Sequence, residues 1–128
     1  MHVGLVGLGK MGANMRTRLR AADVQVTGYD SNPEVSDTGS LAALVDALPD
    51  AQRIVWVMVP AGAPTQGVLD ELGTLLRPGD IVVEGGNSHY ADDARHAEAL
   101  AARGIGYLDV GVSGGVWGLA NGYGLMVG

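Results

Sequence analysis

The stretch VGLVGLGKMGANM, residues 3–15, decides the fold. Its first residues form an uninterrupted apolar run of the kind found in a buried parallel strand, and helical spacing follows over residues 11–21. Between them, Gly7, Gly9 and Gly12 match the spacing GxGxxG. The first glycine suits a tight turn, the second leaves bare backbone beside a pyrophosphate, and the third allows close helix–strand packing. The stretch therefore predicts a strand, a phosphate-binding turn and a helix whose first amides face the anion.

The rest of the chain alternates between strand-like and helix-like segments. Apolar, β-prone runs recur over residues 3–7, 24–29, 53–59, 80–84, 105–110 and 123–128. Helical spacing occupies residues 11–21, 40–48, 64–76 and 92–103. Because strand and helix alternate and crossovers are right-handed, the pattern predicts an α/β fold. We expect a doubly wound, mainly parallel sheet of the Rossmann type, in one domain spanning residues 1–128.

One connection is too short for the usual form of that fold. Only nine residues, SNPEVSDTG, separate Asp30 from Ser40, whereas a crossover that contains a helix needs at least about ten to twelve residues. We therefore expect the second crossover helix and its strand to be shortened or missing. Ser40 is the candidate N-cap of the next helix, and Pro49 ends that helix.

Composition excludes several classes of protein. Hydrophobic residues make up 47% of the chain, which is enough for one core. The net charge is −6 and the basic residues form no run, so we expect no nucleic-acid partner, and arginines such as Arg16 and Arg20 are interpreted as ordinary helix-surface charges. The absence of cysteine and the dispersed His2, His89 and His96 predict no metal site. No signal sequence or membrane-length apolar run occurs, which predicts a cytoplasmic protein without a membrane partner.

Asp30 directly follows the second predicted strand, a little under the ~20 residues after the glycines at which an acidic side chain binds an adenosine ribose hydroxyl. A ribose 2′-phosphate would be repelled there, and the next residues, Ser31, Asn32 and Pro33, supply no arginine. The alternative role for Asp30 is a cap or turn residue before Asn-Pro. We expect NAD in preference to NADP, bound by Gly7, Leu8, Gly9, Lys10, Met11, Gly12 and Asp30.

Two further strand ends lie at the same edge of the predicted sheet, where ligands of open parallel sheets bind. Val59, Pro60 and Ala61 follow one strand and either line the nicotinamide side or form only a proline-bounded turn. The sequence GGNS at residues 85–88 follows the next strand. Its two glycines bring backbone close to a ligand, and Asn87 offers a neutral donor and acceptor suited to the hydroxyls of a polyol.

Three motifs along the chain together carry a family resemblance. They are GLGKMGANM at residues 7–15, GGNS at 85–88 and GVSGG at 111–115 followed by Gly118. They resemble the decarboxylating 6-phosphogluconate dehydrogenases, and VWGLANGYGLM at 116–126 is similar to the shorter, often NAD-preferring bacterial branch. The wider 3-hydroxyacid dehydrogenase superfamily usually lacks Gly-Asn-Ser at this point. A member of that superfamily, such as a 3-hydroxyisobutyrate type, is one alternative, and a non-catalytic NAD-binding module is another.

The resemblance implies an oxidoreductase of the pentose phosphate pathway. Such an enzyme oxidises the C3 hydroxyl of 6-phosphogluconate by hydride transfer to the nicotinamide, and the 3-keto acid then loses CO2 to give ribulose 5-phosphate. By similarity, Asn87 contacts cofactor and substrate, and Ser113, Gly114 and Gly115 hold the substrate carboxylate and hydroxyl region. A hydroxyl and bare amides bind a carboxylate without adding charge, although a turn needed only for packing is the alternative.

The resemblance also implies that part of the enzyme is absent from these residues. The general-base lysine and the acid glutamate of the family lie on a helix beyond the last motif, so both are expected after Gly128. We therefore expect no catalytic residue within 1–128, a fragment that is inactive alone, and no C-terminal helical domain. The full-length enzyme is expected to be a homo-oligomer.

Overall fold

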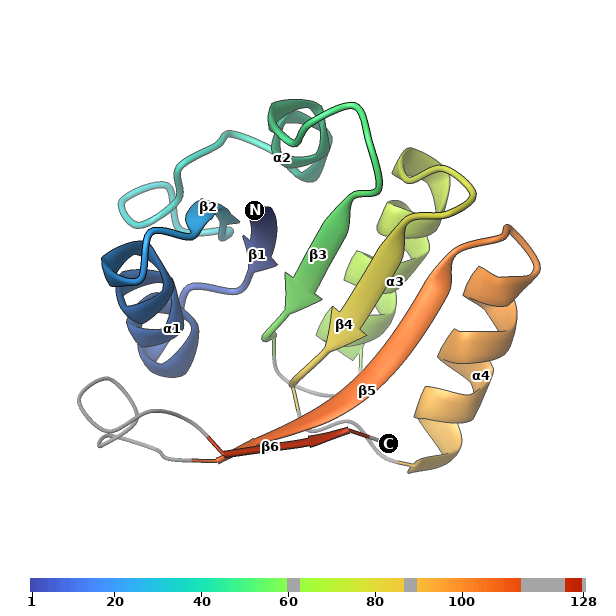
Figure 1. The fold of residues 1–128 in the computed structure, drawn as a ribbon. Coiled ribbons are helices and arrows are strands. Elements are labelled where there is room, and N and C mark those ends of the chain that lie inside the picture. Colours follow the sequence, from blue (N-terminus) through green and yellow to red (C-terminus); the bar gives the residue numbers. More distant parts are fainter. Residues whose placement is uncertain (60–62, 87–89, 114–123, 128) are drawn as a thin grey trace.

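The structure, a computed structural model, describes residues 1–59, 63–86, 90–113 and 124–127, and these form a single sheet flanked by helices (Figure 1). The sheet order is β2–β1–β3–β4–β5–β6, in which all neighbours are parallel except β5 and β6. The strands are β1 (His2–Val6), β2 (Gln25–Tyr29), β3 (Ile54–Val57), β4 (Ile81–Glu84), β5 (Gly106–Ser113) and β6 (Gly124–Val127). The predicted α/β class and the mainly parallel sheet are confirmed.

Helices lie on both faces of the sheet. They are α1 (Lys10–Ala21), α2 (Leu41–Ala47), α3 (Ala63–Leu75) and α4 (Tyr90–Ala101). Val6 belongs to a buried cluster that includes apolar side chains of α2, α3 and α4, whereas its neighbour Leu5 belongs to a second cluster that Leu19 of α1 packs against. Since successive strand residues point to opposite faces, these two clusters are the two sides of a doubly wound sheet.

The second crossover is shortened, as predicted. Residues 30–40 contain neither a helix nor a strand, and the chain passes from β2 through the short α2 to β3, which pairs with β1. Strand β2 is therefore at the outer edge of the sheet. Ser40 caps α2, because its Oγ accepts a hydrogen bond from the Ala43 amide at 3.0 Å, which confirms its predicted role.

The predicted end of the fifth strand needs a correction. Strand β5 extends to Ser113, beyond the predicted end at Val110, so Gly111 and Ser113 of the GVSGG motif belong to the strand. Val112 pairs with Leu125 of β6, and Ser113 pairs with Gly124. The antiparallel partner gives these backbone groups hydrogen bonds, an effect that the low β-propensity of glycine concealed in the sequence.

The final predicted strand is present. The apolar run predicts a strand over residues 123–128, and β6 covers Gly124–Val127, which is all of that range that the structure describes. Tyr123 and Gly128 lie outside the described residues. The expectation that the catalytic lysine and glutamate follow Gly128 is likewise untested by the structure and stays a prediction.

A buried carboxylate joins the amino-terminal ends of β3 and β4. Asp80 is 3% exposed. Its Oδ1 accepts a hydrogen bond from the Arg53 amide at 2.9 Å, and its Oδ2 accepts one from the Arg77 amide at 2.8 Å. These bonds fix the end of the sheet opposite to the candidate site.

Candidate functional site

A cleft of about 830 Å³ opens where the parallel strands end, which is the edge toward which the arrowheads of β1, β3 and β4 point in Figure 1. This volume is in the usual range for a small-molecule site. The lining residues come from the glycine turn, from the ends of four strands and from three helices. They are Val6, Gly7, Gly9, Lys10, Met11, Gly12, Tyr29, Asp30, Ser31, Leu41, Met58, Val59, Gly67, Val68, Glu71, Gly85 and Gly86.

The three glycines of the turn each have a different reason to lack a side chain. Gly7 has a φ of +94°, which other residues rarely adopt. A Cβ on Gly12 would lie 1.9 Å from the Gly7 carbonyl oxygen, so α1 packs too closely on the turn for any side chain. A Cβ on Gly9 would meet no atom within 4 Å. The turn thus has the tight bend, the open middle position and the close packing that the sequence predicted.

The amino-terminal end of α1 borders the same cleft. Gly9 is its N-cap and provides no side-chain hydrogen bond, and the first turn holds no acidic residue. The first amides of a helix have no carbonyl partner within it and carry the positive end of the helix dipole. The exposed Lys10 adds a cation at this place. This end of the cleft therefore favours an anion.

Asp30 connects the glycine turn to the loop after β2. Its Oδ2 accepts a hydrogen bond from the Leu8 amide at 2.7 Å, and its Oδ1 accepts one from the Asn32 amide at 2.9 Å. The bond to Asn32 is the turn role, yet the carboxylate also lines the cleft and keeps free lone pairs for ligand hydroxyls. The two roles considered for Asp30 are compatible. Leu8 contributes its amide, because its side chain packs in the core with Val26.

The ends of β3 and β4 meet at the other side of the cleft. A Cβ on Gly86 would lie 2.2 Å from the Val59 carbonyl oxygen, so only bare backbone fits there. Glu84 is fully buried, and its Oε1 accepts a hydrogen bond from the Gly86 amide at 2.6 Å. Glu84 thus holds this turn against Val59.

The cleft is also lined by residues far from the sequence motifs, which the sequence did not predict. Leu41 of α2 and three residues of α3, Gly67, Val68 and Glu71, line the cleft. Gly67 was the available signal, because a glycine inside a helix costs about 1 kcal/mol relative to alanine and often has a packing or functional reason. A Cβ there would meet nothing within 4 Å, which leaves the cleft open.

The structure describes the remaining predicted site residues only in part or not at all. Of Ser113 only the backbone, in β5, is described. Across the described ranges, no group of three histidine, aspartate or glutamate side chains could hold a metal ion. Within those same ranges no helix is both long and apolar enough to cross a membrane. The predicted contacts that lie outside the described residues are Pro60, Ala61, Asn87, Gly114 and Gly115.

Residues 2–128 match the family model of the NAD binding domain of 6-phosphogluconate dehydrogenase. The chain belongs to this family. Within it, the NAD(+)-dependent, decarboxylating 6-phosphogluconate dehydrogenase of Haloferax volcanii is 43% identical over 100% of the chain, which covers 44% of that relative. The decarboxylating enzyme of Bacillus licheniformis is 37% identical over 98% of the chain, which covers 30% of that relative. The family resemblance predicted from the three motifs is confirmed.

Solved structures share the fold. A 6-phosphogluconate dehydrogenase of Plasmodium falciparum superposes with a TM-score of 0.91 over 99% of the chain at 23% identity, and the chain covers 30% of it. The 3-hydroxyisobutyrate dehydrogenase of Mycobacterium tuberculosis gives a TM-score of 0.86 at 26% identity, over 99% of the chain and 46% of the enzyme. The chain spans less than half the length of each of these relatives. It is a nucleotide-binding domain of the 6-phosphogluconate dehydrogenase type.

Proposed function

We propose that this domain binds NAD for an enzyme that oxidises and decarboxylates 6-phosphogluconate to ribulose 5-phosphate in the pentose phosphate pathway. One observation carries the cofactor part: the glycine turn, the start of α1 and the Asp30 carboxylate line the same cleft. The reaction is supported by the names of the relatives from Haloferax volcanii and Bacillus licheniformis, which are decarboxylating 6-phosphogluconate dehydrogenases.

The cofactor follows the sheet edge in this proposal. Its pyrophosphate lies over Gly9 against the amides of Lys10 and Met11, because that position is open and electropositive. Its adenosine ribose lies at Asp30, and its nicotinamide half extends toward Val59, with Pro60, Ala61 and Asn87 as the remaining predicted contacts. Bound there, NAD supplies the hydride acceptor of the reaction.

The preference for NAD over NADP rests on Asp30. Its carboxylate is an acceptor-only group that can bind ribose hydroxyls, whereas a 2′-phosphate beside it would bring like charges together. The exposed Ser31 and Asn32 that follow carry no compensating positive charge. Hydroxyl recognition and phosphate exclusion thus come from the same side chain.

The substrate side is proposed from the family motifs. Asn87, Ser113, Gly114 and Gly115 hold 6-phosphogluconate, while the acid and the base come from elements after Gly128. Lys10 is the only lysine of the chain, and it lies at the proposed pyrophosphate position rather than beside a reacting hydroxyl. The cytoplasmic location and the homo-oligomeric state of the whole enzyme stay predictions.

Titration calorimetry tests the cofactor proposal. We expect the domain to bind NAD more tightly than NADP, and Asp30→Ala to narrow that difference mainly by weakening NAD. Equal or reversed affinities of the unchanged chain would refute the preference. Robust NADH formation by these 128 residues with 6-phosphogluconate would refute the absence of catalytic groups.

A second candidate function follows from the structural similarity to a 3-hydroxyisobutyrate dehydrogenase, at 26% identity. The two candidates differ in the ligand that the NAD-loaded domain should bind. Tighter binding of 6-phosphogluconate than of 3-hydroxyisobutyrate, measured by the same titration, supports the first proposal. The opposite order favours the second.

A further inference from the structure

Many sheets of this type have another strand beyond β2. Here the backbone at the outer edge of β2 forms hydrogen bonds with side chains and with a loop instead. The Gly28 amide donates to Asp37 Oδ2 at 2.8 Å, and the Gly28 carbonyl accepts from the Asp37 amide at 3.0 Å. Two residues further on, the Asp30 amide donates to Ser36 Oγ at 3.0 Å. Asp37 therefore pairs with β2 at two points, much as a residue of a neighbouring strand would.

Two arginines of α1 hold Asp37 in this position. Arg20 Nη2 lies 2.7 Å from Asp37 Oδ2 and also donates to the Val26 carbonyl of β2 at 2.7 Å. Arg16 Nη1 lies 3.4 Å from Asp37 Oδ1 and donates to the Val35 carbonyl of the loop at 2.9 Å. We refer to Asp37, Arg16 and Arg20 as the Asp37 clasp. It connects α1, the edge of β2 and the loop 31–39.

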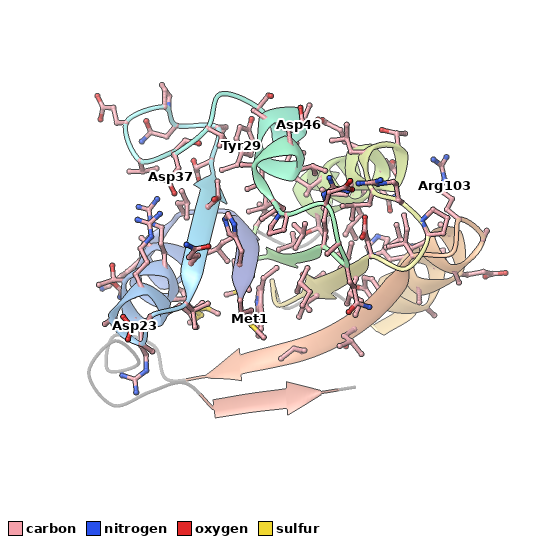
Figure 2. The ribbon with its side chains drawn as sticks, turned by 45° about the horizontal axis from the view of Figure 1, so that its top comes forward. Met1, Asp23, Tyr29, Asp37, Asp46 and Arg103 are labelled. Carbon is pink, nitrogen blue, oxygen red and sulfur yellow. The ribbon has the colours of Figure 1, made fainter. Side chains whose placement is uncertain are left out.

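The position of the Asp30 side chain depends on that loop. Its carboxylate bonds to the Asn32 amide, and its own amide bonds to Ser36. Both partners belong to the loop that Asp37 fixes against β2. Figure 2 shows Asp37 and Tyr29 near the same end of β2, while Asp23 lies near the opposite end, and Tyr29 and Asp30 at that end line the cleft.

We propose that Asp37 is a positioning residue for the cofactor: it fixes the loop 31–39 on the edge of β2 and thereby directs the Asp30 carboxylate toward the adenosine ribose. This inference rests on the proposed NAD site. Without the Asp37 carboxylate, the Gly28 amide loses its partner, and the two arginines lose the charge that holds them to the loop. The loop can then leave β2, and the Asp30 carboxylate is no longer held at the cleft.

A double-mutant cycle tests the proposal. The dissociation constant of NAD is measured by calorimetry for the unchanged chain, Asp37→Ala, Asp30→Ala and the double variant. We expect Asp37→Ala to weaken NAD binding roughly tenfold when Asp30 is present and less than about twofold when position 30 is alanine. Nicotinamide mononucleotide, which lacks the adenosine ribose, should bind all four proteins equally.

Asp50 offers a matched control. It also pairs with two arginines, Arg77 and Arg53, but at the amino-terminal end of β3. Asp50→Ala should leave the NAD dissociation constant unchanged.

Asp37→Asn is the conservative variant. It keeps an oxygen that can accept a hydrogen bond from the Gly28 amide, so it should lose less NAD affinity than Asp37→Ala. It replaces Asp37→Ala if circular dichroism shows that Asp37→Ala is unfolded.

The outcomes separate this inference from the proposal on which it rests. Equal weakening by Asp37→Ala in both backgrounds would overturn the positioning role, because it would mean that Asp37 acts on NAD without Asp30. A full loss of affinity in Asp50→Ala would overturn it as well, since any lost ion pair would then have the same effect. If the unchanged chain bound no NAD, the proposed function itself would fail, and the inference with it.

Discussion

Alanine at position 9 tests where the pyrophosphate lies. A Cβ there meets no atom within 4 Å, and the φ of −66° suits alanine. Replacing a glycine stabilises a fold by about 0.4–1 kcal/mol through the unfolded state, whereas alanine is the poorer N-cap by a similar amount. The free energy of unfolding should therefore change by less than about 1 kcal/mol. The methyl group occupies the space proposed for the pyrophosphate, so NAD affinity should fall at least about tenfold, or about 1.4 kcal/mol.

Alanine at position 12, in contrast, should lower the stability of the fold. Its Cβ would start 1.9 Å from the Gly7 carbonyl oxygen, whereas real Cβ atoms essentially never approach within 3.0 Å. The start of α1 must then move away from the turn by about 1 Å, and overpacking of this kind typically costs about 1–3 kcal/mol. For a domain of this size, each kcal/mol lowers the melting temperature by roughly 3–5 °C.

Thermal unfolding followed by circular dichroism, together with NAD titration, separates the two effects. Gly73→Ala is the control, because a Cβ at Gly73 would make only ordinary contacts of 3.6 Å or more and Gly73 does not line the cleft. Wild-type NAD affinity in Gly9→Ala would show that the pyrophosphate does not lie over this turn. A melting temperature of Gly12→Ala equal to that of the wild type would show that the helix start is free to shift.

The remaining predictions concern stability and pH. Asp80→Asn should lower the free energy of unfolding by about 2 kcal/mol in urea titrations, because a buried carboxylate that accepts two main-chain bonds loses one acceptor, and an unchanged midpoint would contradict this. Burial raises the pKa of Asp37, but the hydrogen bond from Gly28 and the charges of the clasp arginines outweigh it and hold this pKa below 3.8. Ionised Asp37 therefore stabilises the fold above pH 3.8, and this contribution is lost as the pH falls further. Asp37→Asn should flatten the acid limb of a curve of stability against pH. Gly86→Ala should lower both melting temperature and NAD affinity, since its Cβ would lie 2.2 Å from the Val59 carbonyl oxygen; wild-type values for both would refute that packing.

Local patterns predicted most of the fold. The glycine spacing identified the first turn, and the alternation of apolar strands with helices gave the parallel sheet, because both follow from properties of adjacent residues. Even the shortened crossover was visible, since counting residues between Asp30 and Ser40 needs no tertiary information. Boundaries shifted by a few residues, most of all at β5, whose extension depends on pairing with β6.

Such local patterns did not predict which distant side chains pair in the folded chain. Arg16 and Arg20 were interpreted as ordinary surface charges, and this was wrong, because both bind Asp37 and a main-chain carbonyl. Their partner lies 17 to 21 residues away in the sequence, in a loop without periodicity. Nothing in the spacing of charges indicates which arginine meets which aspartate. The same holds for the α3 wall of the cleft, which depends on how the helix lies on the sheet.

The bonded edge of β2 also bears on self-association. An outer strand with free amides and carbonyls is a template on which another polypeptide can add a strand and begin an aggregate. Here the Val26 carbonyl, both backbone groups of Gly28 and the Asp30 amide already have partners within the chain. A crossover can therefore be shortened in this fold without leaving an unpaired strand edge that another chain can join. The condition is that the loop replacing the crossover carries polar side chains at the correct spacing.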